Sequence, residues 1–313
     1  MLALEPAIEH LCTVRDFIRW GASRFQEAGL FYGHGTANAL DEAAVLVLHA
    51  LHLPFDLPEA YFDARLLPDE RRQVVELLQQ RVQKRLPAAY LTHEARFCGL
   101  PFYVDERVLV PRSPIAELIE QQFTPWLDPE GVRAVLDLCT GSGCIAIACA
   151  YAFPEAQVDA VELSPDALAV AQINVDKHQL AERLRLVAGD LYENLEYARY
   201  DLIVSNPPYV NRAEWQGLPA EYHAEPRMGL ESGPDGLDCV RRILAQAGEH
   251  LNAGGILVVE VGSSAETLEA IYPEVPFTWL EFERGGDGVF LLTAQQVEEY
   301  ADLFEKRCRS ANA

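Results

Sequence analysis

The chain has 313 residues, of which 50% are hydrophobic and 23% are charged, so its length indicates two domains and its composition a globular rather than a disordered protein. Its 25 basic and 48 acidic side chains give a formal net charge of −23, which argues against a general affinity for nucleic-acid phosphates and hence against stable DNA binding. The same charge favours a basic protein partner, although acidity also serves solubility alone.

The amino-terminal residues lack the pattern of a signal peptide or membrane anchor. Charges interrupt the first twenty residues, and no uncharged run in the chain is long enough to span a bilayer. Seven cysteines, an odd number, are scattered through apolar segments. We therefore expect no membrane association and a reducing, cytoplasmic location.

Residues 1–95 are predicted to form a small helical domain that recognises the substrate. Val14, Phe17 and Ile18 recur at helical spacing. The segment 68–85 begins with a proline and acidic residues and ends in basic ones, which is the polarity that a helix dipole favours. Residues 96–112 then change to a short alternating pattern, from which we predict a β-hairpin that links two domains.

Residues 113–313 are predicted to form an α/β domain, because apolar strands alternate with helical segments. The predicted strands lie at 134–139, 157–163, 184–190, 200–206, 254–262, 277–282 and 288–293, and the predicted helices at 113–123, 143–153, 164–178 and 237–251. The alternation indicates a doubly wound, Rossmann-like parallel sheet. A short glycine-rich turn separates the last two strands, so we expect them to form an antiparallel hairpin.

A glycine-rich turn, LDLCTGSGC at 136–144, joins the first of these strands to its helix. Gly141 and Gly143 let a ligand approach the backbone, and the helix start offers free N–H groups. The glycines alone also fit a dinucleotide site, with Ala146 at the third position. Asp137 favours a cationic ligand instead, because its carboxylate would repel a pyrophosphate.

Cysteines recur in and after this turn, at Cys139, Cys144 and Cys149. Their even spacing raises the possibility of metal binding. No paired Cys-x-x-Cys spacing accompanies them, and two of the three fall in a small-residue helical pattern. We therefore expect no metal site and interpret these cysteines as small apolar packing residues.

Acidic residues also end the next two strands. Glu162, at 162 − 137 = 25 residues after Asp137, can accept hydrogen bonds from both hydroxyls of a ribose. Asp190 can bind the exocyclic amine of adenine, with Leu191 covering the ring, although acids after strands also cap helices. Together the set favours S-adenosylmethionine, with S-adenosylhomocysteine as its product. The residues expected to bind it are Asp137, Thr140, Gly141, Ser142, Gly143, Glu162, Asp190, Leu191 and Asn206.

The fourth strand ends in Asn206-Pro207-Pro208-Tyr209, which we expect to be the catalytic motif. Two prolines stiffen the tip and fix the direction of its carbonyls. The Asn206 side-chain oxygen and the Pro207 carbonyl can then accept both hydrogens of one –NH₂ group, while Tyr209 lies against its planar face. Such acceptors aim the lone pair of a weak nitrogen nucleophile at a methyl group and stabilise the charge that develops on nitrogen.

With this motif behind a glycine-rich loop, the chain resembles the amino-methyltransferases, and along nearly its whole length it resembles the protein-glutamine branch. The resemblance implies a class I S-adenosylmethionine-dependent methyltransferase fold and methylation of a glutamine side-chain amide. The segments "YGHGTANALDEA", "PRSPIAEL" and "CTGSGCIAIACAYAFP" are similar to the enzymes that act on a basic protein of the large ribosomal subunit. Enzymes that act on release factors usually read "PRPETE" where this chain has "PRSPIAE".

Three other functions stay open on the sequence. They are methylation of a peptide chain release factor, methylation of adenine in DNA, and binding during ribosome assembly without catalysis. A DNA enzyme should show a basic target-recognition region, and an intact Asn206 and Tyr209 speak against a non-catalytic protein. His34 and the long polar loop at 211–236, with Arg227, can contact substrate or be ordinary surface features.

Overall fold

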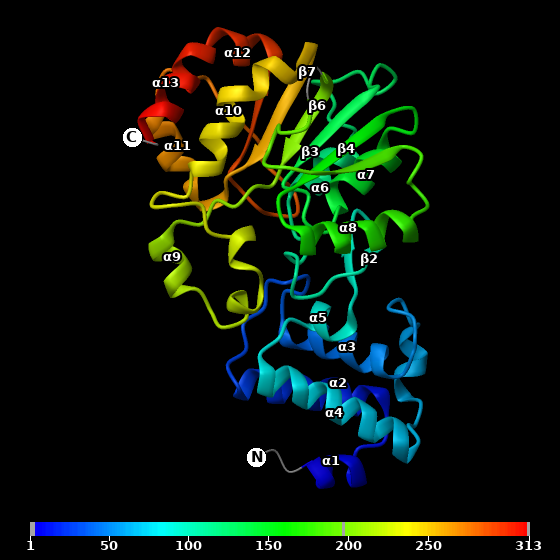
Figure 1. The fold of residues 1–313 in the computed structure, drawn as a ribbon. Coiled ribbons are helices and arrows are strands. Elements are labelled where there is room, and N and C mark those ends of the chain that lie inside the picture. Colours follow the sequence, from blue (N-terminus) through cyan, green and yellow to red (C-terminus); the bar gives the residue numbers. More distant parts are fainter. Residues whose placement is uncertain (1–3, 196–197, 312–313) are drawn as a thin grey trace. The chain divides into compact units, whose positions relative to one another are not determined.

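The computed structural model describes residues 4–195 and 198–311, and the chain divides into two compact units. The helical unit comprises the chain up to Ala95 together with Pro219–Ala224, and the sheet unit comprises Arg96–Leu218 and the chain from Glu225 onward. Figure 1 colours both units along the sequence. Among the described residues, no helix combines the length and the apolar character needed to cross a membrane.

The helical unit is built on amphipathic helices that bury one face each. Thr13 caps the second helix in a reciprocal arrangement with Asp16, and a proline starts the fourth. Phe17, Phe25 and Leu46 are fully buried in the core that these helices share. The elements are α1 Leu4–His10, α2 Val14–Glu27, α3 Ala39–Ala50, the 3₁₀ helix η1 Glu59–Asp63, α4 Pro68–Lys84, α5 Ala88–Thr92 and, from the returning segment, η2 Tyr222–Ala224.

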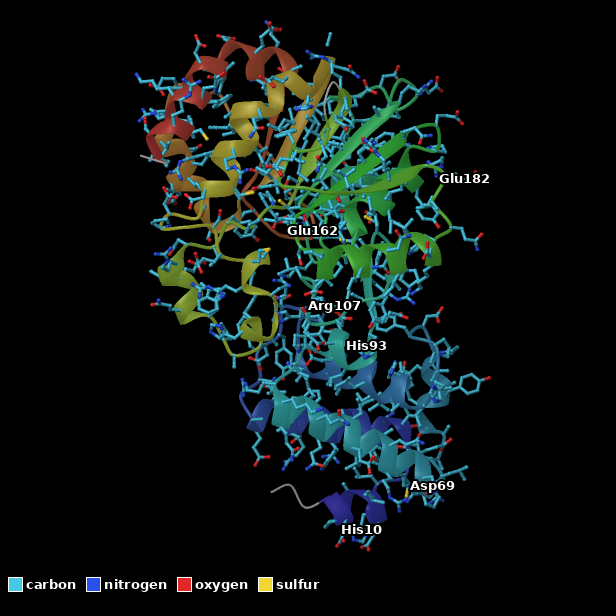
Figure 2. The ribbon with its side chains drawn as sticks, viewed as in Figure 1. His10, Asp69, His93, Arg107, Glu162 and Glu182 are labelled. Carbon is cyan, nitrogen blue, oxygen red and sulfur yellow. The ribbon has the colours of Figure 1, made fainter. Side chains whose placement is uncertain are left out.

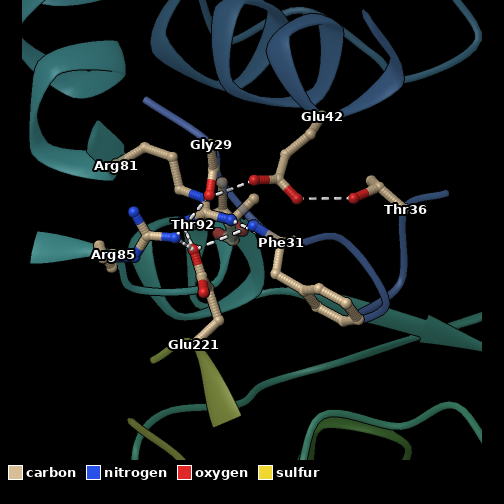
Figure 3. A network of polar contacts seen from close by, with 9 residues as sticks. Gly29, Phe31, Thr36, Glu42, Arg81, Arg85, Thr92 and Glu221 are labelled. Atoms are coloured by element: carbon tan, nitrogen blue, oxygen red, sulfur yellow. Dashed lines mark hydrogen bonds and ion pairs between the residues drawn. The ribbon is translucent and has the colours of Figure 1, made fainter. Parts of the chain in front are cut away.

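A buried ionic network holds the returning segment 219–224 in the helical unit (Figure 3). Arg81, which is fully buried, pairs with Glu42 and, at 3.5 Å, with Glu221. The Glu221 carboxylate also accepts a hydrogen bond from the backbone N–H of Phe31 at 3.1 Å and lies 2.9 Å from Arg85. A buried charge needs such partners, so these contacts anchor the segment.

The sheet unit contains a seven-stranded sheet and a separate two-stranded one. Its strands are β1 Ala95–Phe97, β2 Leu100–Phe102, β3 Ala134–Leu138, β4 Gln157–Glu162, β5 Leu184–Ala188, β6 Tyr200–Ser205, β7 Leu251–Glu260, β8 Thr278–Trp279 and β9 Val289–Thr293. Its helices are α6 Ile115–Glu120, α7 Cys144–Ala152, α8 Pro165–Lys177, α9 Arg212–Gly217, η3 Arg227–Gly229, α10 Asp238–His250, η4 Gly262–Ser264, α11 Ala265–Ile271, α12 Ala294–Glu299 and α13 Ala301–Ala311.

The strand order is β5-β4-β3-β6-β7-β9-β8. The pairs from β5 to β7 are parallel, and β9 is antiparallel to both β7 and β8. The order reverses at β3, beside which β6 lies, so the carboxyl ends of β3, β4, β5 and β6 meet at one edge. A doubly wound sheet binds its ligands in the crevice at such a reversal. The predicted doubly wound, Rossmann-like sheet with a carboxyl-terminal antiparallel hairpin is therefore confirmed.

Alternate residues of the central strands face two hydrophobic layers. Val135, Leu202 and Val204 lie in the core shared with α6 and α7, whereas Leu136 and Ile203 lie in the core shared with α10 and α12. Figure 1 shows these two groups of helices covering opposite faces of the sheet. Burial on both faces explains why the strands read as continuous apolar runs.

The structure corrects three details of the predicted elements. The hairpin pairs β1 with β2 around Cys98 and Gly99, while 103–112 forms no regular element. The last hairpin pairs only Thr278 and Trp279 with β9, so its connection is longer than the predicted turn. The helices α11, α12 and α13 had no counterpart in the prediction.

Candidate functional site

The motif Asn206-Pro207-Pro208-Tyr209 follows the last residue of β6 in the middle of the sheet. Ser205 is paired with Leu138 of β3 on one side and with Val259 of β7 on the other. Its hydroxyl donates to the Leu138 carbonyl at 2.8 Å. The two flanking strands and this hydrogen bond fix the point from which the motif leaves the sheet.

Asn206 and Pro208 line a cavity of about 680 Å³ at this edge of the sheet. The Asn206 side chain is half-buried and makes no hydrogen bond to another described residue, so its amide is available to a ligand. Pro207 and Tyr209 are not among the residues that line the cavity. The Tyr209 hydroxyl donates to Glu260 at 2.8 Å, and its carbonyl accepts from the Ser264 hydroxyl at 2.8 Å.

The glycine-rich loop takes a left-handed backbone at three positions. The φ angles are 60° at Cys139, 56° at Gly141 and 80° at Gly143. A Cβ added to Gly141 would meet nothing within 4 Å, so this glycine opens the backbone to the cavity that it lines. The loop therefore forms an open cradle of the kind that a bound ligand requires.

Asp137 lies below this loop and is fully buried, outside the residues that line the cavity. One carboxylate oxygen accepts hydrogen bonds from the Thr140 hydroxyl and from the backbone N–H of Ala146 at 3.0 Å, while the other is buried without a partner among the described residues. Burial raises the pKa of Asp137 to about 7. In the structure its contacts hold the loop against the start of α7.

Glu162 ends β4 and lies at the wall of the cavity, where Figure 2 labels it. One carboxylate oxygen accepts from the Gly141 N–H at 2.9 Å, and the other accepts from the Ser164 N–H at 2.9 Å. Each oxygen has a second lone pair, so Glu162 can still accept two hydroxyls. Asp190 is paired with Arg242 at 3.0 Å, and Leu191 beside it is buried.

The structure brings most of the predicted cofactor residues to one cavity. The predicted site residues that line it are Thr140, Gly141, Ser142, Glu162, Asp190, Leu191, Asn206 and Pro208, and those that do not are Asp137, Gly143, Pro207 and Tyr209. An open glycine cradle, a carboxylate with spare acceptors and an apolar wall fit the amino-acid, ribose and adenine parts of S-adenosylmethionine. The site thus fits this cofactor.

Further lining residues come from segments whose role the sequence did not reveal. Every residue of the stretch 106–113 lines the cavity, including Arg107, which is labelled in Figure 2. Residues 106–112 of this stretch had been predicted as part of the linking hairpin. Arg112 makes a two-pronged ion pair with Glu225 at 2.6 and 2.7 Å. The pairing holds this stretch to the residues just before 226–233, several of which also line the cavity. Of these residues, the sequence had pointed only to the polar loop 211–236, with Arg227, as a candidate contact with substrate.

Three cysteines, Cys139, Cys144 and Cys239, also line the cavity. The sulfur atoms of Cys139 and Cys239 are 3.8 Å apart and are not bonded to each other. The hydrogen bond between the two thiols and burial raise the pKa of Cys139, so the thiol form is favoured. His34, considered above as a substrate contact, is buried in the helical unit, where its ring lies 4.5 Å from that of Tyr222.

Comparison with known proteins gives matches over part and over nearly all of the chain. Residues 121–220 match the family described as "Methyltransferase small domain". The chain is 54% identical to the ribosomal protein uL3 glutamine methyltransferase of Neisseria meningitidis serogroup B, over 95% of this chain and 98% of the relative. It is 53% identical to the protein of that name from Neisseria gonorrhoeae, over 93% and 97%. The crystal structure of a methyltransferase from Pyrococcus furiosus overlaps with a TM-score of 0.45 and 20% identity, over 63% of this chain and 89% of that one.

Proposed function

This chain belongs to the family of ribosomal protein uL3 glutamine methyltransferases, and from that membership we propose that it methylates the side-chain amide nitrogen of a glutamine in uL3, the third protein of the large ribosomal subunit. The methyl donor is S-adenosylmethionine, which supplies a methyl group on a positively charged sulfur. The net charge of −23 suits a basic ribosomal protein as substrate.

The observation that carries the proposal is the Asn206 side chain. It lines the cavity directly after the central strand β6 and makes no hydrogen bond to another described residue. Its oxygen and the Pro207 carbonyl accept the two N–H groups of the glutamine amide. Held in this way, the nitrogen presents its lone pair to the methyl group, and the two oxygens stabilise the positive charge that develops on it. The proton of the product leaves to water, so the chain needs no dedicated base.

The cofactor is held by the residues around the glycine-rich loop. Gly141 and Ser142 offer an open backbone, Glu162 accepts the ribose hydroxyls, and Asp190 and Leu191 take the adenine. Asp137 and Gly143 act indirectly, because they shape the glycine-rich loop.

Residues 1–95 recognise the protein substrate. Seven free cysteines suit a cytoplasmic location, where thiols stay reduced.

The test is a methylation assay with labelled S-adenosylmethionine and two purified acceptors, uL3 and a peptide chain release factor. We expect label on a glutamine of uL3, located by tandem mass spectrometry, and a loss of at least about 100-fold in kcat for Asn206→Ala. The control is Asn211→Ala, since Asn211 caps α9 and does not line the cavity. Label on the release factor alone would reject uL3 as the substrate.

A further inference from the structure

Glu260 is a buried carboxylate at the end of β7, one strand away from the catalytic motif. It is 5% exposed and is paired through its backbone with Val289 of β9. Because Ser205 of β6 is in register with Val259 of β7, Glu260 and Asn206 are each the next residue on neighbouring parallel strands. The carboxylate therefore stands at the same edge of the sheet as the motif.

Both oxygens of this carboxylate accept a hydrogen bond from a hydroxyl group. One accepts from Tyr209 of the motif at 2.8 Å, and the other accepts from Ser113. Ser113 also accepts a hydrogen bond from the Ile115 N–H at the start of α6, and it lines the cavity. Glu260 thus ties the tyrosine of the motif to the segment that forms another wall of the cavity.

The Tyr209 ring is confined from another side by Gly262. A Cβ added to Gly262 would lie 2.5 Å from a ring carbon of Tyr209, which is far inside van der Waals contact. The Tyr209 carbonyl is fixed in addition by Ser264. The Tyr209 ring packs against the backbone of Gly262, and its carbonyl is hydrogen-bonded to Ser264. The hydrogen bond from the hydroxyl to Glu260 therefore fixes what is left of the side chain's orientation.

We propose that Glu260 is a positioning residue for methyl transfer, because it holds Tyr209 in the orientation that the bound amide requires. The inference rests on the proposed function. Neither Glu260 nor Tyr209 lines the cavity, but Tyr209 belongs to the motif whose Asn206 and Pro208 do. Glu260 therefore acts through Tyr209 on the motif rather than on substrate directly. Its removal should lower kcat and leave the affinity for the cofactor unchanged.

The electrostatic surroundings of Glu260 give the proposal a pH signature. Burial raises its pKa, whereas the hydrogen bonds from Ser113 and Tyr209 and the charge of Arg112 oppose the rise, and Asp287 adds to it. A protonated carboxyl group carries a hydrogen on one of its oxygens, so it cannot accept a hydrogen bond from each of the two hydroxyls as the carboxylate does. We therefore expect kcat to fall as the pH is lowered through the raised pKa of Glu260.

A double-mutant cycle between Glu260→Ala and Tyr209→Phe tests the proposal, with S-adenosylmethionine and the acceptor that the wild type methylates. We expect Glu260→Ala to lower kcat about 30-fold with the KM for the cofactor within about twofold of wild type, and to have less than about a twofold effect when Phe already replaces Tyr209. Glu260→Gln, which keeps an acceptor oxygen, should restore most of kcat. Equal losses in both backgrounds would overturn the proposal.

A matched control comes from the other end of β6. The Tyr200 hydroxyl donates to Asp159 at 2.7 Å, a bond of the same kind in the same unit, and Tyr200→Phe should leave kcat within about twofold of wild type. If Glu260→Ala does not fold, the dependence of kcat on pH in Glu260→Gln tests the proposal instead. Loss of the fall in kcat at low pH in that variant supports the proposal, and an unchanged fall contradicts it. Methylation of another acceptor by the wild type would reject the proposed function but not this coupling.

Discussion

At the scale of single residues, Asp137 shows how one buried carboxylate supports a ligand-binding loop. Its carboxylate next to a glycine-rich loop suggested contact with a cation, yet the structure has it fully buried, accepting from the Ala146 N–H and the Thr140 hydroxyl. The first N–H groups of a helix have no partner within the helix. The buried Asp137 carboxylate accepts a hydrogen bond from one of these N–H groups of α7, that of Ala146.

The unpaired oxygen of Asp137 predicts an unusual dependence of stability on pH in the cofactor-free protein. Its pKa is raised from 3.8 to about 7, so between these values the folded state binds more protons at this site than the unfolded state does. The free energy of unfolding should therefore fall as the pH rises from about 4 to about 7, and this group should add no further change above that.

Urea denaturation of wild type and Asp137→Asn across this pH range measures the effect. The asparagine does not titrate, so the variant should gain stability relative to wild type by on the order of 1 kcal/mol or more per pH unit as the pH rises. Asp302→Asn, at an exposed position of α13, is the control and should run parallel to wild type. A constant difference between Asp137→Asn and wild type would show that Asp137 does not titrate in this range.

At the scale of elements, the central strands were predictable and the segments between them were not. The predicted strands β3, β4 and β6 each end within one residue of the observed ones, because burial on both faces demands continuous apolar runs. Residues 103–112 have the alternating pattern of a strand, and Val104, Val108 and Val110 are indeed buried. Val108 and Val110 line the cavity instead of pairing in a sheet, and such a use leaves no periodic signal.

The turn after β7 carries a glycine whose substitution should have two effects. Gly262 has φ of 43°, and a Cβ there would press into the Tyr209 ring. We expect Gly262→Ala to lower the free energy of unfolding by more than about 2 kcal/mol and to reduce kcat at least about tenfold, since the motif that we propose to be catalytic must shift. Gly254→Ala is the control, because Gly254 has φ of 82° but open space around it.

Thermal unfolding and the methylation assay separate the two substitutions. Gly254→Ala should show only the backbone cost of about 1–2 kcal/mol with normal kcat. Similar activities for the two variants would mean that the Tyr209 ring tolerates displacement, and the close packing on Gly262 would then have no catalytic consequence.

At the scale of the whole molecule, the segment 219–224 joins the helical unit although the residues on either side of it belong to the sheet unit. The chain therefore passes between the units three times, at 95–96, 218–219 and 224–225. Sequence patterns could not reveal this, because the anchor is an ion pair between Arg81 and Glu221, 140 residues apart. The cavity-lining residues 226–233 follow directly after the anchored segment.

Loss of the anchor should destabilise the protein and loosen the loop that follows. Glu221→Gln keeps an oxygen for the Phe31 N–H but removes the charge between Arg81 and Arg85, which should cost about 2–3 kcal/mol of unfolding free energy. Trypsin should also cut more rapidly after Arg227, which lies in that loop. Glu59→Gln, which breaks an exposed ion pair with Arg15, should cost less than about 1 kcal/mol. Equal costs would mean that Glu221 is no anchor.

The net charge of −23 predicts how the protein meets the substrate proposed for it. Attraction between an acidic enzyme and the basic ribosomal protein that we propose as its substrate should speed their encounter, and salt should screen it, since the Debye length is about 10 Å at 0.1 M. We therefore expect kcat/KM for uL3 to fall about tenfold between about 0.05 and 0.5 M sodium chloride. The change should lie mostly in KM, because the amide sits among buried and half-buried groups during transfer.

A short uncharged peptide that contains the target glutamine provides the control for this effect. Its kcat/KM should change less than about twofold over the same salt range, because it carries no charge for the enzyme to attract. If both acceptors lost activity in parallel, salt would be acting on the enzyme or on cofactor binding. If neither did, the acidity of the chain would serve solubility, and recognition of the ribosomal protein would depend on local contacts of residues 1–95 instead of the overall charge.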